Sequence, residues 1–141
     1  MKYYILDPEV AGGLGSRTQM DSSVHPPGVT LLHYELEAWA GEDLVQTFPC
    51  YLVTKRMQAK LTSSRLSGFS FASADVSGSD TFKELQPGEP LPELVWFKIH
   101  GVSGKDDFGL TADARLVVSE RALKVIQTGQ LKYCEVREFK V

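Results

Sequence analysis

The segment Leu52–Leu61, LVTKRMQAKL, aligns without gaps with Val117–Ile126, VVSERALKVI. In both copies a short apolar run is followed by a hydroxyl residue, Thr54 or Ser119, and then by apolar residues at helical spacing. A hydroxyl at this position can accept a hydrogen bond from an unpaired N–H of the first helical turn. Each copy is therefore predicted to pass from a strand into a capped helix.

The similarity continues beyond the two predicted helices. Leu66 and Leu131 each precede a segment with apolar residues at every second position, which predicts a strand. Each copy is thus a strand–helix–strand unit, at about residues 43–75 and 107–141. Two copies are too few for a solenoid, which needs three or more stacked repeats. The pattern indicates an internal duplication within one domain, residues 1–141.

The rest of the chain is predicted to add strands and two long loops. Lys2–Leu6, Leu31–Trp39 and Leu94–Val102 have the apolar or alternating patterns of strands. Glycine and proline are frequent in Ala11–Thr30 and in the loop at about 76–93 that joins the copies, so no regular element is expected there. The sequence therefore predicts an α+β fold, with a mixed, largely antiparallel sheet and two or three helices.

Length and charge narrow the function classes. The chain has 141 residues and a net charge of -3, which is unfavourable for a nucleic-acid binder that neutralises phosphates. Lys55, Arg56, Lys60 and Arg65 cluster around the first predicted helix, but Glu120 replaces Lys55 in the second copy. We interpret these basic residues as a solvated helix face, and we expect no nucleic acid among the partners.

The cysteines and the first residues indicate a cellular compartment. Cys50 and Cys134 have the spacing of neither a zinc site nor a redox pair. We expect buried free thiols in a reducing compartment, with a disulfide between them as the open alternative. The apolar run Lys2–Leu6 ends at Asp7 and is too short for a signal-peptide core or a membrane span. The expected location is cytoplasmic, away from membranes.

No stretch of the sequence has the pattern of an assembled active site. Gly12–Arg17, GGLGSR, has neither the dinucleotide fingerprint nor the Lys-Ser/Thr ending of a phosphate-binding loop. The histidines lack metal-ligand spacing. His100 with Asp106 and Asp107 is the least implausible acid/base group. We therefore expect no catalytic residue, no metal and no cofactor.

Acidic residues gather in the middle of the chain. Between Asp75 and Asp107, seven acidic residues face three basic ones, a surplus that suits a basic protein partner. The candidate partner-binding residues are Asp80, Glu84, Glu89, Glu93, Asp106 and Asp107.

A set of short motifs runs through both copies: Asp43, Phe48–Pro49, Tyr51–Thr54, Leu66–Phe69, Trp96, Asp106–Phe108, Leu116–Arg121 and Leu131. Together, over about residues 31–141, they resemble the immunity-protein families of bacterial polymorphic toxin systems. The resemblance implies a small cytoplasmic α+β protein that binds and inhibits a cognate secreted or contact-delivered toxin. It implies no catalytic residues.

Two other function classes stay open at this point. One is a small enzyme with an acid/base site at His100, Asp106 and Asp107, and the other is a regulatory domain that recognises a protein. A homodimer is also open if an edge strand is left unpaired, because such an edge can pair with a second chain.

Overall fold

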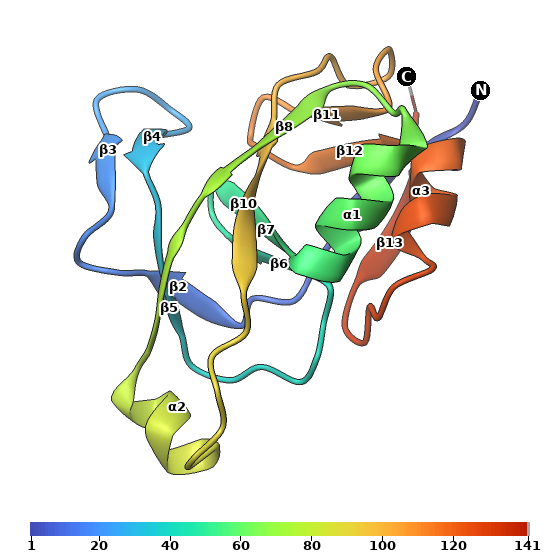
Figure 1. Cartoon of the computed structure of the whole chain (residues 1–141). Helices are drawn as coiled ribbons and strands as arrows, with labels where there is room; N and C mark the ends of the chain where they lie inside the picture. Colours follow the sequence, from blue (N-terminus) through green and yellow to red (C-terminus); the bar gives the residue numbers. More distant parts are fainter. Residues whose placement is uncertain (141) are drawn as a thin grey trace.

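The computed structural model describes residues 1–140, and three helices and thirteen strands lie in that range (Figure 1). The helices are α1 (Lys55–Ser64), α2 (Asp80–Leu85) and α3 (Glu120–Ile126). The strands are β1 (Tyr3–Asp7), β2 (Gly12–Leu14), β3 (Gln19–Asp21), β4 (Gly28–Leu31), β5 (His33–Leu36), β6 (Leu44–Thr47), β7 (Cys50–Thr54), β8 (Phe69–Ser73), β9 (Asp75–Gly78), β10 (Leu94–Ile99), β11 (Phe108–Leu110), β12 (Leu116–Ser119) and β13 (Glu135–Phe139). The predicted α+β class is confirmed; Val141, the end of the second copy, lies outside the described residues.

The two copies of the repeat build two antiparallel sheets of the same design. The sheet orders are β6-β7-β10-β8 and β11-β12-β1-β13. In each sheet, three strands come from one copy: β6, β7 and β8 in the first sheet, and β11, β12 and β13 in the second. The central strand comes from the segment that precedes the other copy, so β10 lies in the first sheet and β1 lies in the second. Neither sheet is complete without strands from both halves of the chain.

The registers of the two central strands are equivalent. Leu6 of β1 lies opposite Val136, and Phe97 of β10 lies opposite Phe71, which is the residue aligned with Val136. Because a shift of one residue would turn every side chain to the other face of a sheet, the shared register sends the same positions of both sheets inward. The inner faces meet in one core with Leu6, Phe97 and Phe108 at its centre.

The predicted helix caps are confirmed. The Thr54 hydroxyl accepts a hydrogen bond from the backbone N–H of Met57 at 3.3 Å, and the Ser119 hydroxyl accepts one from Ala122 at 3.2 Å. Both helices then bury their apolar stripe in the shared core. Figure 1 shows α1 and α3 side by side over the sheets, with α2 at the far end of the molecule.

Both of the long loops predicted from the sequence contain regular structure. The prediction was wrong for Ala11–Thr30, which holds β2, β3 and β4, and for the joining loop, which holds α2. The glycines that suggested a loop allow close packing instead, since a Cβ on Gly12 would lie 2.2 Å from the Glu35 carbonyl oxygen of the neighbouring strand. Helix α2 is too short to show a periodic pattern, and it buries only Phe82.

Further boundaries differ from the predictions. The segment Leu31–Trp39 contains the last residue of β4 and all of β5. The alternating pattern predicts that His33 faces solvent, but His33 is 2% exposed because β5 lies between β2 and β9. Strand β10 ends at Ile99. Both cysteines are free, as expected, but only Cys50 is buried, whereas Cys134 is half-buried.

A second core covers the outer face of the first sheet only. Leu52 and Trp96 of that sheet pack with Tyr34 and Phe82 of the β2-β5-β9 layer and α2. The equivalent face of the second sheet is covered by the short loop 100–107. This loop lies very close to Gly109 of β11, since a Cβ on Gly109 would be 2.4 Å from the backbone nitrogen of Ser103. Among the described residues, no helix combines the length and apolar character needed to span a membrane.

Candidate functional site

Two buried aspartates occupy equivalent places in the two copies. Asp43 directly precedes β6 and Asp107 directly precedes β11, and they are 1% and 4% exposed. Each carboxylate accepts a hydrogen bond from a helix cap, at 2.5 Å from Thr54 to Asp43 and at 2.6 Å from Ser119 to Asp107. The cap hydroxyls therefore donate to an aspartate and accept from the helix at the same time.

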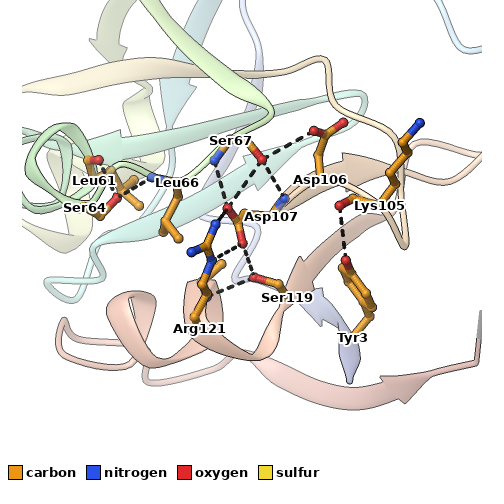
Figure 2. A network of polar contacts seen from close by, with 11 residues as sticks. Tyr3, Leu61, Ser64, Leu66, Ser67, Lys105, Asp106, Asp107, Ser119 and Arg121 are labelled. Carbon is orange, nitrogen blue, oxygen red and sulfur yellow. Dashed lines mark hydrogen bonds and ion pairs between the residues drawn. The ribbon is translucent and has the colours of Figure 1, made fainter. Parts of the chain in front are cut away.

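An arginine two residues after each cap pairs with the same aspartate. Arg121 donates to both oxygens of Asp107, at 2.8 and 2.7 Å (Figure 2). Arg56 donates to Asp43 through Nε alone, at 2.5 Å. A two-pronged arginine–carboxylate contact is geometrically more demanding than a single one, so the second cluster is the more tightly defined of the two.

Each aspartate also holds the other copy in place. Asp43 accepts a hydrogen bond from the backbone N–H of Gln130, which follows α3, at 2.7 Å. Asp107 accepts one from the N–H of Ser67, which follows α1, at 3.0 Å. The carboxylate oxygens are thus filled by internal donors, and the two clusters act as clamps between the copies. We call them the Asp43 clamp and the Asp107 clamp.

The clamps lower the pKa of both aspartates. The Arg121 guanidinium, together with the Ser119 hydroxyl, outweighs the opposing effect of burial and holds the pKa of Asp107 at about 2. Burial by itself would raise the pKa of Asp43, but hydrogen bonds from Thr54, Gln130 and Arg56 favour the charged form and bring the pKa below its ordinary value. Both side chains are therefore charged at neutral pH.

The candidate partner-binding residues divide into two groups at opposite ends of the molecule. Those around α2 are exposed to solvent: Asp80, Glu84, Glu89 and Glu93. Asp106 and Asp107 lie in the loop before β11, beyond the far end of β10 (Figure 1). Asp106 accepts hydrogen bonds from Val102 and Ser67, and Asp107 belongs to its clamp. The six residues do not form one surface.

The alternative acid/base group is not assembled. Within residues 1–140, no hydrogen bond or ion pair joins the His100 ring to Asp106 or Asp107. A general base must lie within hydrogen-bonding reach of the proton that it removes, and it must be free to accept that proton. The Asp107 carboxylate does not meet the second condition, because its oxygens accept hydrogen bonds from Arg121, Ser119 and Ser67.

The structure brings together a histidine and a serine that the sequence does not link. His33 on β5 and Ser77 on β9 lie on neighbouring parallel strands, with Nε2 and Oγ 2.8 Å apart. The backbone N–H of Arg17 donates to His33 Nδ1 at 3.1 Å, and the Arg17 guanidinium lies 3.2 Å from Nε2. Arg17 therefore contacts both nitrogens of the ring, and His33 is 2% exposed.

A groove lies beside the carboxyl end of α2. It has a volume of about 330 Å³ and we call it the Trp39 groove; its lining residues are Glu9, Ala38, Trp39, Ala40, Glu42, Leu85, Gln86 and Tyr133. Leu85 and Tyr133 are each 65% exposed, although both are large and carry apolar surface. Exposed apolar side chains grouped around a hollow are typical of protein-binding surfaces.

Charge is strongly separated over the molecule. The helical layer, residues 55–65 and 120–132, holds seven basic side chains and one acidic side chain. The segments 35–42 and 80–93, which include most of the groove and α2, hold seven acidic side chains, of which Glu42 is buried, and one basic side chain, Lys83. The net charge of -3 therefore conceals an acidic end and a basic helical layer.

Sequence reasoning missed both the clamps and the groove. The clamps had a signal, because Asp43 lies 11 residues before Thr54 and Asp107 lies 12 residues before Ser119, with an arginine two residues after each cap. The groove had none, since its walls come from four segments far apart in the chain.

Among residues 1–140, no three histidine, cysteine, aspartate or glutamate side chains are grouped so that they could hold a metal ion. Comparisons of the chain with models of known protein families and with curated proteins found no match.

Proposed function

We propose that this chain is a cytoplasmic immunity protein that binds a cognate bacterial toxin and inhibits it. The observation that carries this proposal is the acidic end of the molecule, where exposed apolar side chains line the Trp39 groove and carboxylates surround it. A surface of this kind suits the recognition of a protein with a basic surface. The family resemblance of the repeat motifs supplies the biological role.

Inhibition would be steric. The immunity protein would cover the functional surface of the toxin, and complementary charge would accelerate the encounter of the two proteins. No covalent step is needed. The locked carboxylate of Asp107 supports binding over catalysis, because its oxygens already accept hydrogen bonds from Arg121 and Ser119.

Co-expression tests the function directly. The chain is expressed together with the product of the gene directly upstream, and growth and co-purification are measured. We expect the neighbouring product to stop growth when expressed alone, and the chain to restore growth and to purify with it. A harmless neighbour that forms no complex would exclude the immunity role.

A further inference from the structure

The walls of the Trp39 groove are fixed by hydrogen bonds. The backbone N–H of Trp39 donates to the Gln86 side chain at 2.9 Å, and the Gln86 amide donates back to the Trp39 carbonyl oxygen at 3.1 Å. The indole N–H donates to the Glu42 carbonyl oxygen at 3.1 Å. The groove therefore exists before any partner arrives, and a partner would lose less free energy to ordering it.

Two features of the lining select the chemistry of an occupant. Trp39 and Tyr133 supply aromatic rings, and Glu9 supplies a carboxylate at the edge of the same groove. Aromatic faces attract cations, arginine most often, because the planar guanidinium stacks on a ring while it donates to a carboxylate. A lysine ammonium is also attracted to an aromatic face, but it has no planar group that stacks on a ring and donates to a carboxylate with two nitrogens.

The residues around the groove add further negative charge, which also favours a basic partner surface. Glu37 and Glu84 are the chain neighbours of lining residues, both are exposed, and neither forms an ion pair within the described residues. By contrast, the apolar cavity of about 300 Å³ between Pro26 and Trp96 has a single charged lining residue, the basic Lys98. The Trp39 groove therefore combines two aromatic walls, Trp39 and Tyr133, with nearby carboxylates that form no ion pair within the described residues.

We propose that the Trp39 groove is the docking site for an arginine side chain on a basic protein surface, with the surrounding carboxylates facing the rest of that surface. The identification of this partner as the toxin rests on the proposed function, but the chemistry of the groove does not. The arginine acts as the anchor, and the carboxylates of the acidic end contribute mainly to association rate and salt dependence.

A titration with a peptide probe tests the groove without a toxin. Hexa-arginine is added to the isotope-labelled full chain at low salt, and amide and indole chemical shifts are recorded. We expect the largest shifts at the Trp39 indole, the Gln86 side-chain amide and the Tyr133 backbone, with hexa-glutamate as the inert control. The shifts should fade as the Debye length falls from about 30 Å at 0.01 M salt to about 3 Å at 1 M. Shifts at other sites, or none, would overturn the proposal.

Variants then test the groove in the toxin complex. Leu85→Ser/Tyr133→Ser removes exposed apolar walls, and Glu37→Lys/Glu84→Lys reverses the surrounding charge. We expect each pair to weaken toxin binding about 30-fold, as loss of a binding hot spot does. The matched controls, Val102→Ser/Met20→Ser and Glu120→Lys/Glu138→Lys, change exposed residues elsewhere and should leave affinity within about threefold.

The outcomes separate the two proposals. If the wild-type chain binds hexa-arginine in the groove but forms no complex with the neighbouring gene product, the docking-site proposal stands and the immunity role is excluded. If the wild-type chain forms the complex but both groove variants leave its affinity unchanged, the immunity role stands and the docking-site proposal is wrong.

Discussion

The two copies of the repeat differ most in the segment that follows each central strand. After β10 the chain reaches the second copy through the short loop 100–107, whereas after β1 it passes through residues 8–43 before the first copy begins. This longer segment supplies β2 to β5 and one wall of the Trp39 groove. The repeated positions thus carry the fold, while the candidate binding surface is built mainly where the copies are unlike.

The clamps show the opposite relation, because here the copies are alike. Each buried aspartate binds the cap and arginine of its own copy and the loop after the helix of the other copy. With the exchanged central strands, this arrangement makes each half depend on the other. We therefore expect the molecule to unfold as one unit, and the following substitutions test that equivalence.

The largest effect is expected from the central strands. Phe97→Ala and Leu6→Ala remove equivalent fully buried side chains and should lower the free energy of unfolding by about 4 and about 3 kcal/mol. Urea unfolding followed by fluorescence and by circular dichroism measures both losses. If Leu6→Ala unfolded in two separate transitions, the two halves would unfold independently. The two copies would then be similar in structure but would not stabilise each other.

The clamps should give the next largest effect. Asp43→Ala and Asp107→Ala each leave a buried hydroxyl and a backbone N–H without a partner, at a cost of about 3 kcal/mol. Asp113→Ala, in an exposed ion pair, is the matched control and should cost less than about 1 kcal/mol. Chemical denaturation measures the free energy of unfolding of each variant. If only one of the two aspartate substitutions lowered it, the two clamps would not be equivalent.

Acid should weaken the Asp107 clamp in a defined pH window. Its folded pKa of about 2 lies below the ordinary value of 3.8, so the native state binds fewer protons and is favoured above this range. The contribution, about 2 kcal/mol, is present above pH 4 and is lost as the pH falls toward 2. Arg121→Gln should raise the Asp107 pKa and flatten the loss of stability across this window.

Unfolding free energies measured at several pH values test the slope. Arg115→Gln, which removes the exposed partner of Asp113, serves as the control and should leave the slope nearly as steep as in the wild type. An unchanged slope in Arg121→Gln would mean that the arginine does not set the Asp107 pKa.

The sequence was sufficient for features that depend on local pattern. The caps Thr54 and Ser119, the helical stripes and the strands next to them follow from residue type and spacing, and these predictions are confirmed. Exchange of the central strands could not be predicted, because the pattern of β1 specifies a strand but not its partner. Pairing of β1 with β12 depends on contacts between residues at least 110 positions apart, such as Leu6 and Leu116.

The candidate site could be predicted only in its charge. Glu84 and Glu89 were identified because acidic residues are frequent there, but no pattern connects Trp39 with Gln86 and Tyr133, which meet only after folding. Asp107 was identified for the same reason as Glu84, yet it is buried in a clamp. Charge in a sequence predicts the sign of a surface, whereas tertiary contacts decide which charges remain on it.

The smallest effect concerns the cysteines, which lie at unlike places in the two copies. Burial raises the pKa of Cys50 to about 12 and that of Cys134 to about 11, so both groups are thiols, not reactive thiolates, at neutral pH. Cys50 is also closed off between the first sheet and the β2-β5-β9 layer. With a thiol reagent in excess, Cys134 should react slowly in the native state, and Cys50 only as fast as the layer opens. Cys50→Ala and Cys134→Ala assign the two phases.

Reaction of Cys50 at the global unfolding rate would show that the β2-β5-β9 layer opens only when the sheets unfold. A faster reaction would show that the unrepeated segment, which carries part of the Trp39 groove, opens by itself over a sheet that remains folded.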